Sequence, residues 1–240
     1  LLDAVLRELR SDGNNFEANI VVFPGKRPGH FLHQRLARSL GAAFIPPKVY
    51  ALGEFVEVLY REQLDQGEGD LDSLDAIGLL FELTGHGSML PGEGQFRTPG
   101  SFYPLGVRLL GELEELRAGN VAPAVITALA GEYGLESLGL LARLYAPFYD
   151  EVTKRGLSTA AQRSERVALA IETLTFKSGT DLIVAAMSLV QAQQAMVLRE
   201  LLNRRDVLLL LEIAPGIERL CAQLGVSASA EAASVSPAIP

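Results

Sequence analysis

The sequence predicts an α/β fold, in which a parallel sheet is flanked by helices and an all-helical subdomain is inserted into the sheet region. Short apolar runs with β-branched residues, typical of strands buried on both faces of a parallel sheet, occur near both ends of the chain. Between them, residues 101–175 show the apolar spacing of helices and no strand-like run. We therefore expect the strands of one sheet to come from both ends of the chain.

The first part of the predicted core covers residues 1–64. Apolar spacing predicts these elements in chain order: a helix at 2–11, a strand at 18–23, a helix at 28–40, a short strand at 42–47 and a helix at 51–64. Pro28 suits the first turn of its helix, where a missing N–H costs nothing. Two apolar stripes should face the core: Leu32, Leu36 and Leu40, and Leu52, Phe55, Val56 and Leu59.

Residues 65–176 are predicted to be a mainly helical insertion, and residues 177–225 the second part of the core. The insertion has helical patterns at 74–83, 102–119, 122–133, 135–156 and 159–174. The α/β pattern resumes with a strand at 181–187, a helix at 190–204 and a strand at 206–213. Residues 226–240 are small and polar, and we expect them to form a flexible linker.

Composition narrows the function classes. The chain has 240 residues and a net charge of −8, which argues against a free-standing nucleic-acid binder but allows one basic strip. Such a strip is Lys26, Arg27, Arg35 and Arg38, a run without acids; a solvated helix face is the alternative interpretation. The single cysteine, Cys221, suits a reducing cytoplasm, and the apolar runs are too short to predict a membrane span.

The stretch "NIVVFPGKRPGHF" has the layout of a strand that enters a helix through a phosphate loop. A nucleotide phosphate loop needs a glycine four residues before Gly-Lys and a Ser or Thr after it. Ile20 and Arg27 occupy these positions, and Pro24 and Pro28 remove two backbone donors. Residues 182–199 also contain no acid that could hold magnesium. The sequence therefore excludes a standard phosphate loop here.

Other chemistry is also not supported. No acid stands two residues before any of the lysines, as restriction-like nucleases require. His30 and His33 lie one helical turn apart, but no carboxylate or thiol is near them in the sequence, and "GHGSM" lacks the final glycine of a serine elbow. We expect no catalytic residue, metal site or cofactor in this segment. An unusual hidden nucleotide or hydrolase site stays open, and calorimetry with ATP would reveal it.

Several segments, in order, resemble AddB-like proteins. The stretches "VFPGKRPGHFLHQRLA" and "FIPPKVYALGEFVEVLY" resemble the start of that family, and "TPGSFYPLGVRLLGELEELRAGNV" is similar to its aromatic-Gly-x-x-Leu-Leu helix. The stretch "DLIVAAMSLVQAQQAMVLRELLNRRDVLLLLEI" resembles a later strand, helix and strand. The resemblance implies a subunit of a helicase–nuclease for recombinational repair of DNA double-strand breaks, with a superfamily 1 helicase fold and a PD-(D/E)XK exonuclease domain far C-terminal.

The resemblance also implies what this part does. In a working helicase of that fold, the strand at 182–187 carries paired acids followed by a glutamine; here Ala186 and Met187 or their neighbours replace the acids, while three glutamines remain: Gln191, Gln193 and Gln194. We therefore expect a degenerate, P-loop-like helicase core without ATPase activity that guides one DNA strand and contacts the motor subunit. The candidate DNA-binding residues are Pro24, Gly25, Lys26 and Arg27. A protein-interaction scaffold without DNA contact is the alternative.

Overall fold

The computed structural model describes residues 1–90, 94–133, 136–176, 179–187, 190–203 and 207–226. The helices are α1 (Leu2–Glu8), α2 (Lys26–Leu40), α3 (Leu52–Gln63), α4 (Ser73–Leu83), α5 (Pro99–Ala118), α6 (Pro123–Tyr133), α7 (Glu136–Lys154), α8 (Ala160–Ala170), α9 (Ala192–Leu202) and α10 (Ile217–Leu224). The strands are β1 (Asn19–Phe23), β2 (Lys48–Ala51), β3 (Gly69–Asp70), β4 (Leu157–Ser158), β5 (Asp181–Ala185) and β6 (Val207–Leu210). The predicted linker at 226–240 lies, after Val226, outside the described residues.

A parallel sheet of order β2-β1-β5-β6 forms the α/β part of the molecule. Ile20 in β1 stands opposite Lys48 of β2 on one side and Leu182 of β5 on the other. The central strand β1 therefore joins an early and a late part of the chain. This confirms the predicted parallel sheet and the prediction that its strands come from both ends of the sequence. The strand burial explains the apolar runs, because Val21, Val22 and Phe23 are fully buried.

The predicted second strand was misplaced. The sequence placed it at 42–47, but β2 begins at Lys48, directly after Pro46 and Pro47. Proline has no N–H to donate to a β-ladder, so pairing with β1 starts only beyond the two prolines. The two-residue pair β3–β4 was not predicted, because elements this short produce little periodic signal. Helix α10 was also missed, although Ile217, Leu220 and Leu224 repeat at helical spacing.

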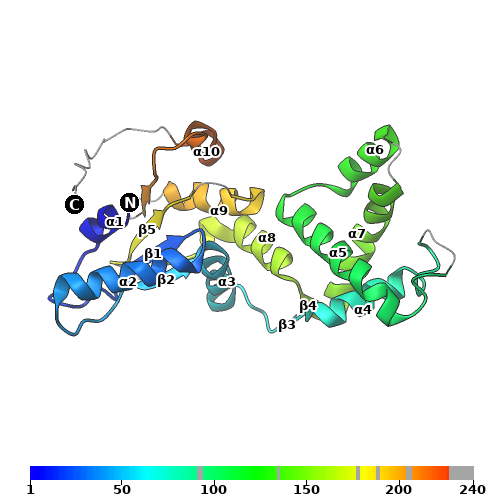
Figure 1. Cartoon of the computed structure of the whole chain (residues 1–240), viewed down its shortest axis with the longest axis horizontal. Coiled ribbons are helices and arrows are strands. Elements are labelled where there is room, and N and C mark those ends of the chain that lie inside the picture. The colour runs from blue at the N-terminus through cyan, green and yellow to red at the C-terminus, as the bar shows by residue number, and fades with distance from the viewer. Residues whose placement is uncertain (91–93, 134–135, 177–178, 188–189, 204–206, 227–240) are drawn as a thin grey trace, which may run out of the picture.

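Helices cover both faces of this sheet (Figure 1). One face packs against α1 and α2, and its buried side chains include Val5, Leu32 and Leu36. The other face packs against α3, α8, α9 and α10, and all four side chains predicted for the stripe of α3 are buried there. The stripe predicted for α2 is also present, with Leu32 and Leu36 buried and Leu40 packed at the edge of its cluster.

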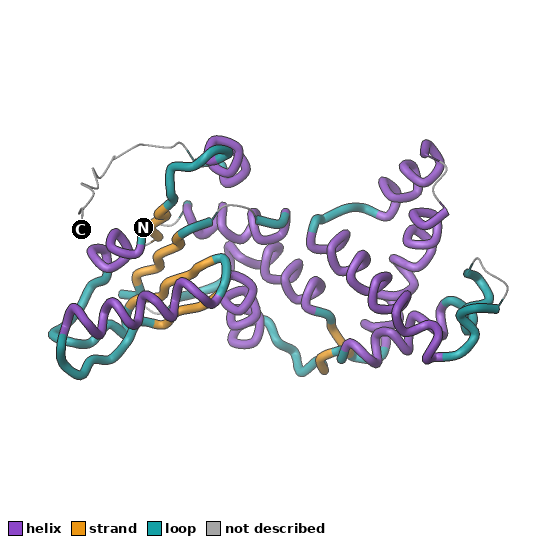
Figure 2. Tube along the Cα trace, in the orientation of Figure 1, coloured by secondary structure: helices purple, strands orange, loops and turns teal. Residues whose placement is uncertain are grey.

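The helices α4 to α7 form a separate apolar cluster, centred on buried residues such as Phe102, Leu113 and Phe148. Figures 1 and 2 show an elongated molecule, with the sheet at one end, these helices at the other, and β3 and β4 between them. Helix α8 packs in the sheet's cluster through Val167 and Ala168. The predicted boundaries at 65 and 177 stay a prediction. Within the described residues, every helix is too short or too polar to cross a membrane.

Candidate nucleic-acid interface

The turn between β1 and α2 holds all four candidate residues, Pro24, Gly25, Lys26 and Arg27. Gly25 is the N-cap residue of α2 in an extended conformation, and no side chain caps this helix end. By helix geometry, the backbone N–H groups of the first turn have no intrahelical acceptor. Since Pro28 has no N–H, the unpaired donors belong to Gly25, Lys26 and Arg27. The turn therefore presents backbone donors and two cations on one short segment.

This turn lies at the switch point of the sheet. The neighbours β1 and β5 lead into α2 and α9, which lie on opposite faces. In open parallel sheets, the crevice at the carboxyl ends of two such strands is the usual ligand position. The residues after β5 are Ala186, whose φ is +64°, and the buried Met187. Neither side chain has an oxygen to hold a metal ion or carries a charge, so among the described residues that directly follow these two strands the cations come from the β1 side.

The two cations of the turn differ in their surroundings. Lys26 Nζ lies 2.5 Å from Glu54 Oε1, and Glu54 also accepts the backbone N–H of Ala51 at the start of α3. The hydrogen bond from Lys26, followed by that from Ala51, lowers the pKa of Glu54 below its usual value. Arg27 is exposed and forms no ion pair with another described residue. A passing phosphate would meet a free guanidinium and an ammonium that is shared with a carboxylate.

Sequence reasoning missed a neighbouring aromatic side chain. Phe31 is 52% exposed and lies one helical turn after Arg27. With Gln34 and Arg38, these two residues share the side of α2 that faces away from Leu32 and Leu36. We call Arg27, Phe31, Gln34 and Arg38 the α2 outer face. The signal was present in the sequence, because Phe31 falls outside the leucine stripe.

Two of the three glutamines near the start of α9 have side-chain contacts with a structural role. Gln194 Oε1 accepts the backbone N–H of Gln191 (3.2 Å) and so caps the helix. The buried Gln193 donates from Nε2 to the carbonyl oxygen of Arg117 (2.8 Å), which ties α9 to the end of α5. The structure brings neither side chain's hydrogen-bonding group to the β1–α2 turn. Both side chains thus have contacts within the protein that do not involve a bound nucleotide.

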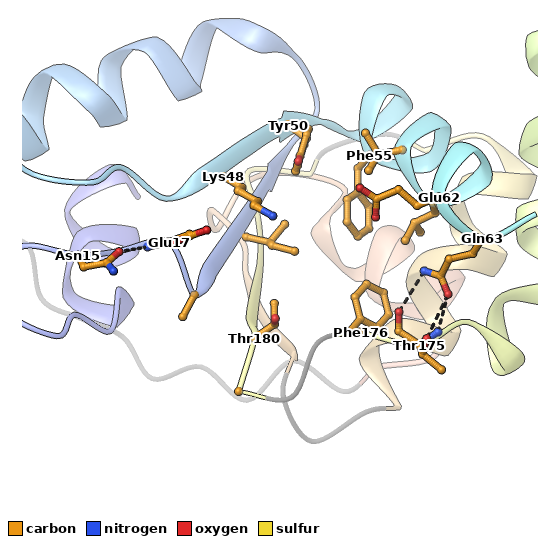
Figure 3. Close-up of a pocket in the computed structure, with 15 residues that line it drawn as sticks. Asn15, Glu17, Lys48, Tyr50, Phe55, Glu62, Gln63, Thr175, Phe176 and Thr180 are labelled. Carbon is orange, nitrogen blue, oxygen red and sulfur yellow. Dashed lines mark hydrogen bonds between the residues drawn. The ribbon is translucent and has the colours of Figure 1, made fainter.

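A pocket of about 370 Å³ opens at the amino ends of β1 and β2 (Figure 3). The β1–α2 turn lies at the opposite, carboxyl end of these strands. Lys48 and Glu62 point toward the open space of the pocket from opposite sides, and neither forms an ion pair with a described residue. Gln63 bridges to Thr175, donating to its carbonyl oxygen (3.0 Å) and accepting its N–H (2.8 Å). The described residues that line the pocket include carboxylates and a lysine but no histidine or cysteine.

Metal chemistry finds no support in the part of the chain that the structure describes, which contains no group of three or more His, Cys, Asp or Glu placed to hold a metal ion. Comparison with known proteins adds no relative: no protein-family model matches the sequence, and no curated protein matches it. The functional proposal therefore rests on the geometry of the β1–α2 turn and on the order of the stretches that resemble AddB-like proteins.

Proposed function

We propose that this chain is a non-catalytic, helicase-like domain of an AddB-type helicase–nuclease subunit, acting in the cytoplasm in the repair and recombination of DNA double-strand breaks. Its degenerate P-loop-like core is the parallel sheet with its flanking helices, and α4 to α7 are the inserted helical subdomain. It guides a single DNA strand within the full complex and contacts the motor subunit. The motif order and the strand order of the sheet support this proposal.

The observation that carries the proposal is the position of an exposed, uncapped, doubly cationic turn at the switch point of a parallel sheet. A DNA phosphate at the start of α2 would accept the backbone N–H groups of Lys26 and Arg27 and face the positive end of the helix dipole. The two side chains would add charge-assisted contacts. In this proposal the turn binds a DNA phosphate. It does not hydrolyse a nucleotide, because no acid that could hold magnesium follows β5 directly.

The α2 outer face extends the same surface. An exposed phenylalanine between two arginines matches the needs of single-stranded DNA, because bases stack on aromatic rings while cations follow the backbone. Stacking requires no particular base. The proposed contact is therefore independent of DNA sequence, as expected for a strand guide.

Charge reversal tests this proposal. In the full complex, Lys26→Glu with Arg27→Glu should weaken binding of single-stranded DNA at least about tenfold. The steepness of log affinity against log salt concentration should fall by about 1.4, the value expected for the loss of two phosphate contacts to single-stranded DNA. Binding measured by fluorescence anisotropy at several salt concentrations gives both quantities. Lys48→Glu with Arg143→Glu is the matched control, since both residues are exposed, lie elsewhere, and change the net charge equally. An unchanged salt dependence of DNA binding in the Lys26→Glu, Arg27→Glu variant would contradict the proposal.

A second candidate function is a protein-interaction scaffold without DNA contact. It is favoured by the exposed apolar row Val125, Leu129 and Tyr133, which lies along one side of α6. In that case Val125→Asp with Leu129→Asp would release the motor subunit in pull-down assays, and Lys26→Ala with Arg27→Ala would leave DNA processing intact. Loss of DNA processing in the latter variant, with the complex still assembled, would reject the scaffold-only function.

A further inference from the structure

The apolar residues of α4 to α7 and those of the sheet form separate clusters, so the molecule has two lobes. We call α4 to α7 the helical lobe, and the sheet with its other helices the sheet lobe. The chain crosses between the lobes at β3 and at β4, which pair over two residues. The lobes also meet where α5 reaches α8 and α9 (Figure 1). Lobes joined in this way move relative to each other unless their interface is large and apolar.

Polar contacts hold α5 to the sheet lobe. Arg117 of α5 donates from Nε to Glu165 Oε2 of α8 (3.1 Å), and its carbonyl oxygen accepts a hydrogen bond from Gln193 Nε2 of α9 (2.8 Å). Glu114, one helical turn earlier on α5, accepts the backbone N–H of Ala161 at the start of α8 (3.1 Å). We call these five residues the α5 clasp.

Apolar packing adds little to this contact. The alanines Ala118 of α5 and Ala161 of α8 are buried, but neither belongs to an apolar cluster. A pocket of about 240 Å³ remains between the lobes, and residues of α3, α5, α8 and the start of α9 line it. The interface is therefore polar and incompletely filled, as interfaces between mobile domains are.

The α5 clasp contains one contact that favours closure and one group that opposes it. Arg117 and Glu165 attract each other, and because their side chains are 19% and 31% exposed, salt weakens that attraction. Gln193 is 1% exposed, and its Oε1 accepts no hydrogen bond from a described residue. A buried amide oxygen without a donor is costly, and opening would return it to water.

The crossing segments on the other side of the molecule suit a hinge. Gly156, between α7 and β4, has a φ of +69°, and nothing lies within 4 Å of the place where a side chain would begin. On the other crossing, two residues separate β3 from α4. Short segments at the ends of elements are where proteins absorb the backbone rotation of a hinge.

We propose that the α5 clasp opens and closes, and that the helical lobe turns about the β3–β4 crossing when it does. The pocket between the lobes includes Gly53, next to Glu54, the partner of Lys26. Opening therefore widens the space beside the β1–α2 turn. The movement itself does not depend on whether that turn binds DNA.

Distances between two spin labels test this proposal on the chain itself. The labels are placed on Leu169→Cys of α8 and Ala128→Cys of α6, both exposed, in a chain that also carries Cys221→Ser. Raising the salt concentration from about 0.1 M to about 1 M shortens the Debye length from about 10 Å to about 3 Å. The fraction of molecules with a second, longer distance between the labels should then rise at least about threefold. One unchanged distance at every salt concentration would overturn the proposal.

A variant shows whether the α5 clasp controls the movement. At about 0.1 M salt, Glu165→Gln should raise the fraction with the longer distance at least about threefold, because it removes the charge that holds Arg117. Glu151→Gln is the matched control, since Glu151 also pairs with an arginine, Arg155 (3.0 Å), but within the helical lobe. Circular dichroism confirms that both variants are folded. Equal fractions in the two variants would overturn the proposal, even if salt alone changed the distance.

Discussion

At the scale of single residues, Glu54 holds the ammonium of Lys26 and would compete with DNA for it in the proposed contact. Its carboxylate lies 2.5 Å from Lys26 Nζ, and 79% of the lysine side chain is exposed. Glu54→Gln should therefore raise the affinity of the full complex for single-stranded DNA about threefold and steepen its salt dependence, because one competing charge is removed. Anisotropy titrations would measure both. Unchanged affinity would mean that Lys26 does not contact DNA.

The same pair sets a pH dependence. Because hydrogen bonds lower the pKa of folded Glu54, its contribution to stability is present above the unfolded pKa and is lost as the pH falls through the folded pKa. The window lies below the usual glutamate value of 4.5. Acid unfolding followed by circular dichroism should show a shallower decline for Glu54→Gln in that window. An identical decline would show that the pair adds no stability in solution.

Single-residue features were predictable only in part. The sequence pointed to the cations of the β1–α2 turn because they follow an apolar strand, and its periodicity placed Phe31 outside the buried stripe. It did not predict the partner of Lys26, since Glu54 belongs to another helix and meets Lys26 only once β1 and β2 have paired.

At the scale of elements, two glycines of α5 form a matched pair. A methyl group at Gly106 would lie 2.6 Å from Ile77 Cγ2 and 2.8 Å from Phe102 Cε1, whereas one at Gly111 would meet nothing within 4 Å. Gly106→Ala should therefore destabilise the protein by about 1–3 kcal/mol through overpacking. Gly111→Ala should stabilise it by about 0.5–1 kcal/mol through helix propensity.

Urea unfolding would measure both changes. If Gly106→Ala proved as stabilising as Gly111→Ala, the close packing of α5 on α4 would be wrong. The contrast also shows the limit of prediction at this scale. Apolar spacing predicted α5 as a helix. The two glycines have the same helix propensity, but they differ in the space around them, because Ile77 of α4 packs against Gly106. The sequence alone does not show that Ile77 lies there.

At the scale of the whole molecule, the β3–β4 pair connects the sheet with α4 to α7, and a buried arginine fixes it to the sheet side. Arg163 on α8 donates to Glu57 of α3 (2.8 Å), to the carbonyl oxygen of Ser158 in β4 (3.0 Å), and pairs with Asp70 of β3 (3.1 Å). Its side chain is 11% exposed. One guanidinium thus holds both β3 and β4 against the helices that cover the sheet.

Arg163→Met should cost about 2 kcal/mol of stability, because Glu57, Asp70 and the carbonyl oxygen of Ser158 each lose a charged donor at a largely buried position. Arg61→Met is the matched control: Arg61 also contacts Glu57 and Asp70, but its position is more exposed and the loss should be much smaller. Thermal unfolding would compare the two. Equal losses would contradict the anchoring role of Arg163.

The overall arrangement was only partly readable from the sequence. Apolar runs at both ends predicted a sheet shared between them, because buried parallel strands need such runs. The packing of α8 with the sheet depends on Val167 and Ala168 meeting α3 and α9, which are distant in the sequence. Helical spacing shows that a side is buried, and it does not show against which partner.

The central claim is that DNA passes over the β1–α2 turn, and photo-crosslinking measures this most directly. A photoreactive amino acid at position 27 in the full complex should crosslink to single-stranded DNA. The same amino acid at position 17, on the exposed Glu17 at the opposite edge of the sheet, should not. DNA crosslinks at position 27 alone are the predicted result; crosslinks to protein but not to DNA at position 27 would contradict the account.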